Sequence, residues 1–252
     1  MICTGYSLMF VLSLYVWEAS RQRYGRDNPL VIKQRFFSVF CVCLVSFIIN
    51  YFLGFHPKQL GISLDISGVH AAFTGLLVTL ILFFGPLVQL GLHWHEESIP
   101  DLRDLAVLRN LVVGPFAEEF FFRAMMLPLL VESGFSMILT TVISMGLFAL
   151  AHVHHYYHSS LGRVLFQMFY TSLFGAFSSF LFLRTGNWLA PFVSHAFCNY
   201  MGFPQVNPKD PYFKIICVSY VLGLLGFLSF SMTLTDPCYH NSIFFKDSCP
   251  AQ

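Results

Sequence analysis

Long apolar stretches, separated by short polar segments, run through the whole chain. Eight of them can be recognised, at about residues 2–17, 36–53, 70–92, 110–131, 137–153, 164–183, 188–203 and 215–234. Their length, and their lack of strict alternation between apolar and polar positions, favours helices over strands. A transmembrane helix needs about 20 apolar residues. The pattern therefore predicts an all-α fold, a polytopic membrane bundle of about eight transmembrane helices that forms one integral membrane domain over residues 1–252.

The composition supports this prediction. Of the 252 residues, 56% are hydrophobic and only 11% are charged, whereas roughly a quarter of the residues in a soluble domain are charged. So high an apolar fraction excludes a disordered chain. A formal net charge of +1 also excludes nucleic acid as a partner, because nucleic-acid-binding proteins need a basic surface. Membrane lipid is the expected surrounding of the chain.

The basic residues indicate how the bundle is oriented. Arg21, Arg23, Arg26, Lys33 and Arg35 form a basic loop after the first apolar stretch, and the positive-inside rule places such a loop in the cytosol. If the eight stretches cross the membrane in turn, ten basic residues fall on the cytosolic side and three on the other side. Both termini are then expected on the non-cytosolic side.

The seven cysteines include no C-x-x-C pair, so they predict no structural zinc site. Cys238 and Cys249 lie in the same non-cytosolic tail, and the sequence leaves a disulfide between them open. Cys249 also begins the ending Cys-Pro-Ala-Gln252, which has the spacing of a prenylation box. Because Pro is not the aliphatic residue of that motif, and because prenylation is cytosolic, we expect Cys249 to carry no prenyl group.

Two adjacent carboxylates lie deep inside an apolar stretch. They are Glu118 and Glu119, in the run Gly-Pro-Phe-Ala-Glu-Glu-Phe-Phe-Phe-Arg123. On a helix, Glu119 and Arg123 are four residues apart and can pair, which gives Glu119 a structural role as the alternative to a catalytic one. Glu118 points about 100° away on such a helix. An ionisable side chain inside the membrane without a local partner is a candidate functional residue.

Two histidines and an asparagine lie in later stretches. His152 is near the end of the fifth stretch, and His195 and Asn199 are four residues apart in the seventh. For a single histidine in an apolar helix, the alternative is a hydrogen-bonded residue of the core. The orientation set by Lys and Arg nevertheless places these three residues and Glu118 in the cytosolic half of the membrane. We therefore expect the four groups to meet in one polar cavity.

Such a set of groups can hydrolyse an amide bond. A carboxylate can remove a proton from water, and imidazole and amide N–H groups can donate to the oxyanion that develops on a carbonyl. No covalent nucleophile is required. Ser194 adjoins His195, but adjacent residues on a helix do not face each other, so a Ser–His pair is not expected there.

At these residues the chain resembles the glutamate-dependent intramembrane proteases, also called the CPBP or ABI family, and among them the type II CaaX prenyl proteases, or Ras-converting CaaX endopeptidases. The family motifs are Glu-Glu-x-x-x-Arg, Phe-x-x-x-His and His-x-x-x-Asn. Here they read Glu118-Glu119…Arg123, Phe148…His152 and His195…Asn199. The resemblance is strong over about 105–205, the expected catalytic core.

The resemblance implies a protease of the endoplasmic reticulum membrane, multi-pass, with its active site facing the cytosol and with neither a cofactor nor a metal. Its substrates would be farnesylated or geranylgeranylated CaaX proteins, such as Ras-type small GTPases, from which it removes the last three residues. By the same resemblance, Glu118 and His152 activate water, and His195 and Asn199 form the oxyanion hole. Glu119 and Arg123 would hold the site together.

Two other functions remain open at this stage. The first is a zinc-dependent membrane protease, because His154, His155 and His158 follow His152, and His93 and His95 lie in another cytosolic loop. The chain has no H-E-x-x-H signature, however. The second is a non-enzymatic scaffold that binds prenyl groups or lipid, or a proton-coupled transporter. A transporter usually has two related halves, and we find no such halves.

Overall fold

The computed structural model describes residues 1–94, 100–152, 161–204 and 206–249. These residues form helices and no strand, which confirms the predicted all-α membrane fold. The helices are α1 Ile2–Tyr15, α2 Glu18–Tyr24, α3 Pro29–Phe52, η1 Pro57–Leu60, α4 Ile66–Leu82, α5 Phe84–Leu92, α6 Leu105–Leu108, η3 Arg109–Val113, α7 Gly114–Glu119, η4 Phe120–Met125, α8 Leu127–Glu132, α9 Met137–Leu150, α10 Leu161–Thr185, α11 Leu189–Met201, α12 Phe213–Leu234 and η6 Ile243–Ser248.

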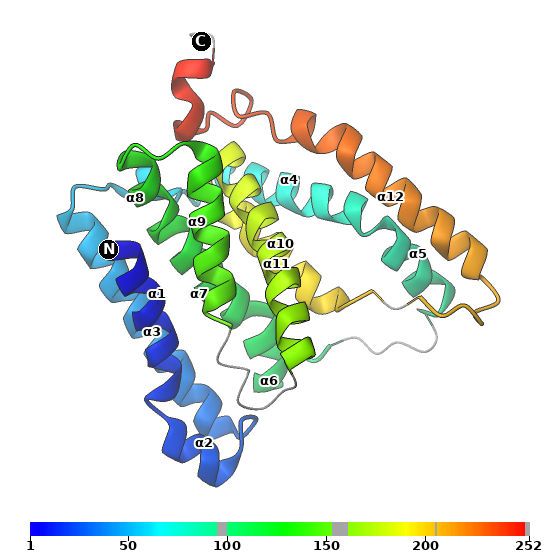
Figure 1. Cartoon of the computed structure of the whole chain (residues 1–252), viewed down its shortest axis with the longest axis horizontal. Helices are drawn as coiled ribbons and strands as arrows, with labels where there is room; N and C mark the ends of the chain where they lie inside the picture. Colours follow the sequence, from blue (N-terminus) through cyan, green and yellow to red (C-terminus); the bar gives the residue numbers. More distant parts are fainter. Residues whose placement is uncertain (95–99, 153–160, 205, 250–252) are drawn as a thin grey trace.

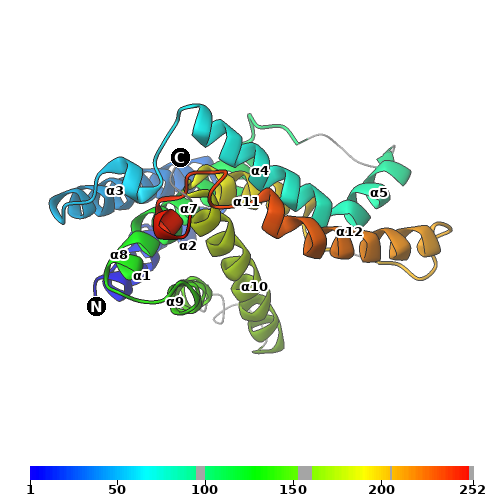
Figure 2. The same cartoon turned by 90° about the horizontal axis from the view of Figure 1, so that it is seen from above.

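The helices pack as a central group with two helices on one side and three on the other. Figure 1 shows α1 beside α3 on one flank and α12 along α4 and α5 on the other, with α9, α10 and α11 between them. The view from above in Figure 2 has the same order. The run from α6 to α8 passes through the middle, and its side chains at Phe121, Phe122 and 124–127 are fully buried.

Side-chain caps define where several helices begin. The Asp65 carboxylate accepts hydrogen bonds from the backbone N–H groups of Ser67 and Gly68 at the start of α4. Asn28 caps α3 in the same way, and Ser136 caps α9. Such caps satisfy backbone donors that have no partner within the helix. They separate the apolar helices from their short connections.

All eight predicted apolar stretches coincide with helical segments. Among the described residues, four helices are long and apolar enough to cross a membrane: 2–24, 29–52, 162–185 and 213–234. The pair α4 and α5 is bent by 71° and would make a fifth span. The other three stretches form shorter or interrupted helices, and the total of eight spans stays a prediction.

The predicted basic loop after the first stretch is wrong in one respect. The sequence suggests a loop that contains the basic residues Arg21 to Arg35, but the structure contains the short helix α2 there, and α3 already begins at Pro29. Lys33 and Arg35 therefore lie in the first turns of α3. Long basic side chains can extend from a helix end to the membrane surface or into a cavity, so charge does not end the helix.

The central helical run, from α6 to α8, contains two short segments whose turns are wider than those of an α-helix. Its segments η3 and η4 are π-helical, and they flank α7. Wide turns of this kind are rare and often occur at functional sites. They leave backbone carbonyls to be satisfied by neighbouring helices, as a membrane interior requires. Asn50 of α3 donates to the Met125 carbonyl at 3.2 Å, and Ser144 of α9 donates to that of Phe122 at 3.5 Å.

Two glycines allow close approach of backbones. A Cβ atom at Gly75 of α4 would lie 2.4 Å from the Ala190 carbonyl oxygen of α11, and one at Gly223 of α12 would lie 2.9 Å from that of Ile81. Small residues at helix contacts are typical of membrane bundles, where packing replaces the hydrophobic effect. Gly75 thus brings α4 against α11, the helix that carries His195 and Asn199.

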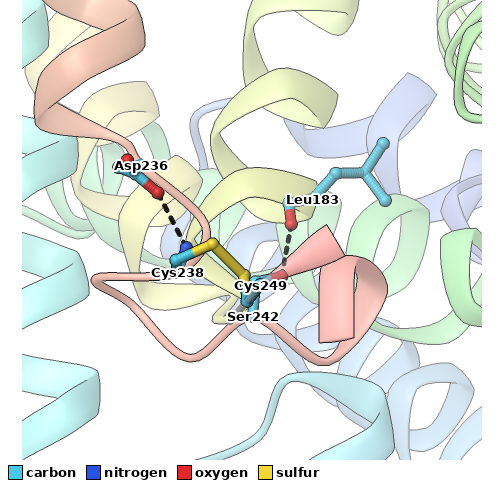
Figure 3. The surroundings of a disulfide bond; sticks show 5 residues. All are labelled: Leu183, Asp236, Cys238, Ser242 and Cys249. Carbon is cyan, nitrogen blue, oxygen red and sulfur yellow. Dashed lines mark hydrogen bonds between the residues drawn. A yellow bond between two sulfur atoms is a disulfide. The ribbon is translucent and has the colours of Figure 1, made fainter. Parts of the chain in front are cut away.

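The segment after α12 folds back over the end of α10. Cys238 and Cys249 form a disulfide, which settles the alternative left open by the sequence (Figure 3). The Ser242 hydroxyl donates to the Leu183 carbonyl at 2.6 Å. Figure 1 places this segment and α2 at opposite ends of the bundle. Disulfides persist in oxidising compartments, so the bond supports a non-cytosolic position for this end.

Because the Cys249 sulfur is bonded, it is not available for a thioether. We expect the protein purified from eukaryotic cells to carry no prenyl group on Cys249. Thiol alkylation of the denatured, unreduced protein should label the five free cysteines, at positions 3, 41, 43, 198 and 217. Labelling after reduction should add Cys238 and Cys249. A farnesyl adduct on Cys249 in the intact mass would contradict both the bond and the non-cytosolic position.

Candidate active site

Glu119 is the centre of a buried polar network. Its side chain has 0% exposure and lies 3.2 Å from Arg123 Nε. Its other carboxylate oxygen accepts a hydrogen bond from His195 Nδ1 at 2.8 Å. The Ser178 hydroxyl of α10 donates to the carboxylate oxygen of Glu119 that lies near Arg123. A carboxylate out of contact with water needs several such partners, and here they come from three helical segments.

Arg123 is equally buried. Its side-chain exposure is 0%, and its guanidinium lies 4.5 Å from the centre of the Phe148 ring. It donates to the Gly175 carbonyl at 3.2 Å. The pair that the sequence suggests on the basis of spacing is therefore present, although the helix widens directly after Glu119. Arg123 connects the central run to α9 and α10.

Glu118 faces a different environment. Its side chain is 25% exposed, and its carboxylate lies 3.9 Å from His195 Nε2. His195 is thus placed between two carboxylates, with Glu119 at Nδ1 and Glu118 near Nε2. The ring of Phe174 packs against this imidazole at 4.5 Å between ring centres. The arrangement orients His195 so that Nε2 faces Glu118.

His152 follows α9 and is half-buried. Its Nδ1 lies 2.8 Å from the Phe148 carbonyl oxygen. Because a carbonyl only accepts, Nδ1 carries the proton of this hydrogen bond. In the neutral ring Nε2 is then the basic nitrogen, so the backbone contact selects one tautomer.

Asn199 is exposed at the end of α11. Its Nδ2 donates to the Asn110 carbonyl at 2.9 Å, which fixes the orientation of the carboxamide. Asn110 lies in the π-helical segment η3. The wide turn thus supplies an acceptor to a residue that is distant in sequence.

A cavity of about 1070 Å³ connects these groups. Glu118, His152 and Asn199 line it together with residues of α1, α2, α3 and the central run. His195 is not among the described lining residues, and it reaches the cavity wall through Glu118. The structure therefore brings all four predicted catalytic residues close to one site, with Glu119 and Arg123 behind it.

Sequence reasoning missed the supporting contacts of this site. Ser178, the Gly175 carbonyl and the Asn110 carbonyl were not singled out, because a lone serine or a backbone carbonyl has no distinctive sequence pattern. The zinc alternative depends on His93, His95, His154, His155 and His158. Of these, His93 is described, and its Nε2 lies 2.8 Å from Asp210 Oδ2; the other four lie outside the part of the chain that the structure describes.

Comparison with known proteins identifies the family. The family model described as "Type II CAAX prenyl endopeptidase Rce1-like" matches residues 103–201. The human CAAX prenyl protease 2 is 36% identical over 276 aligned residues, covering 96% of this chain and 82% of the human protein. This chain belongs to the CAAX prenyl protease 2 family.

Relatives from a plant and a fungus indicate the same family. The Arabidopsis thaliana CAAX prenyl protease 2 is 30% identical, covering 98% of this chain and 92% of that protein. The probable CAAX prenyl protease 2 of Schizosaccharomyces pombe is 30% identical, with 92% and 91% covered. No solved structure matches the chain closely enough to count as a relative. These relatives are named as proteases, which confirms the family that the sequence motifs predicted.

We expect Glu119→Gln to destabilise the fold, because it leaves the Arg123 guanidinium buried without a counter-charge. Loss of one partner from a buried pair costs about 3–5 kcal/mol, which thermal unfolding in detergent should show as a lower midpoint. Adding Arg123→Met should restore part of the loss, since it removes the uncompensated charge. Glu118→Gln is the matched control and should unfold near the wild-type temperature. Equal midpoints for both single variants would contradict this role of Glu119.

Proposed function

We propose that this protein is an endopeptidase that removes the last three residues from prenylated CaaX proteins, using water activated by Glu118 and His152. The observation that carries the proposal is that Glu118, His152 and Asn199 line one cavity, with His195 lying 3.9 Å from Glu118. Membership of the CAAX prenyl protease 2 family supplies the class of substrate. The proposed catalytic core is about 105–205.

Glu118 and His152 are the proposed bases. One removes a proton from a water molecule as the water oxygen attacks the carbonyl carbon of the peptide bond after the prenylated cysteine. The 25% exposure of Glu118 lets water reach its carboxylate, whereas Glu119 is fully buried and engaged. This difference in environment supports different roles for the two adjacent glutamates.

Asn199 and His195 are the proposed oxyanion donors. One N–H of the Asn199 carboxamide is engaged by the Asn110 carbonyl, and the second N–H is directed to the developing negative charge. His195 donates from Nε2 when both ring nitrogens carry a proton, because Nδ1 is already engaged by the Glu119 carboxylate. Fixed donors of this kind stabilise the charge without reorganising in the transition state.

Collapse of the tetrahedral intermediate completes the reaction. The carbon–nitrogen bond breaks, and the base that took the proton from water returns it to the leaving amine. The products are a protein that ends in a prenyl-cysteine carboxylate and a free tripeptide. No bound metal is needed for this balance, because the proton moves between water, the base and the amine.

We place the site on the cytosolic side of the endoplasmic reticulum membrane. The distribution of basic residues and the opposite location of the disulfide support this orientation. A farnesyl or geranylgeranyl chain is apolar and can lie in lipid while the peptide enters the cavity. Ras-type small GTPases are proposed substrates because they present such an end to the cytosol.

Glu118→Gln should reduce the cleavage rate about 10²–10⁴-fold, the usual contribution of a general base. The measurement is mass-spectrometric release of the tripeptide from a farnesylated CaaX peptide by purified protein in detergent, with and without a chelator. Wild-type activity should persist with the chelator. Glu132→Gln, an exposed glutamate at the end of the same helical run, is the matched control. Near wild-type turnover by Glu118→Gln would exclude Glu118 as the base, and inhibition by the chelator would favour the zinc alternative.

Asn199→Ala should lower kcat by roughly 10²–10³-fold, as expected for one oxyanion donor, with little change in KM. Steady-state kinetics on the same peptide separates the two parameters. A variant with a raised KM and an unchanged kcat would place Asn199 in substrate binding instead.

A further inference from the structure

The same cavity has a basic wall that the proposed chemistry does not use. Four arginines line it, each from a different segment of the chain: Arg21 of α2, Arg26 of the α2–α3 connection, Arg35 of α3 and Arg109 of η3. The only carboxylates among the described lining residues are Glu18 and Glu118. Positive charge therefore exceeds negative charge inside the cavity.

Two of the four arginines already have carboxylate partners. Arg21 pairs with Glu18, with 2.5 Å between the closest atoms. Arg109 donates to Asp27 at 2.8 Å, and this hydrogen bond lowers the pKa of the Asp27 carboxyl group, so that Asp27 stays ionised. The first contact lies within α2, and the second joins η3 to the α2–α3 connection.

Arg26 and Arg35 lack such a partner. Among the described residues, no carboxylate is hydrogen-bonded to either guanidinium. Arg35 Nε is buried without a hydrogen-bond partner in that part of the chain, and its only described hydrogen bond is a long one of 3.4 Å to the Leu14 carbonyl. Partial desolvation and the charge of Arg109 lower the pKa of Arg26, although a guanidinium remains protonated. Two guanidinium groups that line one cavity, with no carboxylate hydrogen-bonded to either among the described residues, favour an anionic ligand.

The basic wall adjoins the proposed catalytic groups. Arg109 Nε donates to the Asn110 side chain at 3.0 Å, and the Asn110 carbonyl accepts from Asn199. One residue thus separates the arginine group from the proposed oxyanion donor. Three residues of extended chain span at most about 10 Å, so a peptide cleaved near Asn199 has its terminus close to this wall.

We propose that Arg26 and Arg35 bind the free C-terminal carboxylate of the substrate and so select the last three residues for removal. The inference rests on the proposed function, since it names the group of the proposed substrate that these two arginines bind. A guanidinium matches a carboxylate with two parallel hydrogen bonds. The site would define the cleavage position from the chain end, while the prenyl group anchors the substrate from the other side.

Other basic residues nearby do not share this position. Arg23 is exposed on α2, and Lys33 is exposed on α3; neither lines the cavity. They are suited to contact phosphate groups at the membrane surface, whereas Arg35, which is half-buried, and Arg26, which is exposed, both line the cavity. Arg23→Gln is therefore a matched control that removes one charge from the same region.

The test compares two farnesylated peptides that differ only at the end, one with a free carboxylate and one with a carboxamide. A hydrogen bond to a charged group contributes about 1.5–3 kcal/mol, which corresponds to roughly a 10–100-fold preference of the wild-type protein for the carboxylate in kcat/KM. Arg26→Gln should lower this preference, and Arg26→Gln with Arg35→Gln should bring it near unity. The rate with the carboxamide should change little, which shows that the variants are folded and active. Arg23→Gln should keep the full preference.

Other outcomes would contradict the proposed carboxylate site. Equal cleavage of both peptides by the wild-type protein would overturn the carboxylate site and leave the proposed function intact. An unchanged preference in Arg26→Gln and in the double variant would do the same. If the variants lost activity on both peptides equally, and anionic lipid vesicles activated only the wild-type protein, the arginines would bind lipid headgroups instead. Cleavage of neither peptide would overturn the proposed function, and this site with it.

Discussion

The buried contact of Glu119 with Arg123 is the constraint on which the rest of the site depends. Both side chains are fully enclosed, and an unpaired charge in such surroundings is strongly destabilising. The hydrogen bonds to this pair come from α10, through Ser178 and the Gly175 carbonyl, and from α11, through His195. Three segments of the chain must therefore meet in one arrangement, and that arrangement also positions His195 beside Glu118.

The widened central helix makes this meeting compatible with a membrane. A regular helix would satisfy its own backbone, but it would also limit which residues face α3, α9 and α11. The π-helical turns at η3 and η4 redirect the side chains around α7, and neighbouring helices satisfy the carbonyls at Phe122 and Met125. Irregular backbone at this depth is tolerated because it is covered by protein.

The adjacent glutamates illustrate how environment separates two identical groups. Glu119 is surrounded by donors, whereas Glu118 is 25% exposed and lines the cavity. The same cavity is lined by His152, Asn199 and the four arginines. The proposed ligand, with a bond to be hydrolysed and an anionic end a few residues away, would contact both kinds of group.

The sequence by itself determined the helical membrane fold, the candidate residues and the pairing of Glu119 with Arg123, because apolar length and helical spacing are local properties. It could not show that Glu119 contacts His195, that α2 is helical, or that Cys238 is bonded to Cys249. The Glu119–His195 contact and the disulfide each join residues whose distance is set by how the chain packs. Helix α2 lies in a basic segment, and its tertiary surroundings stabilise it. The basic wall was also decided by tertiary structure, since Arg26, Arg35 and Arg109 serve only as an orientation signal until α2, α3 and η3 enclose a common cavity.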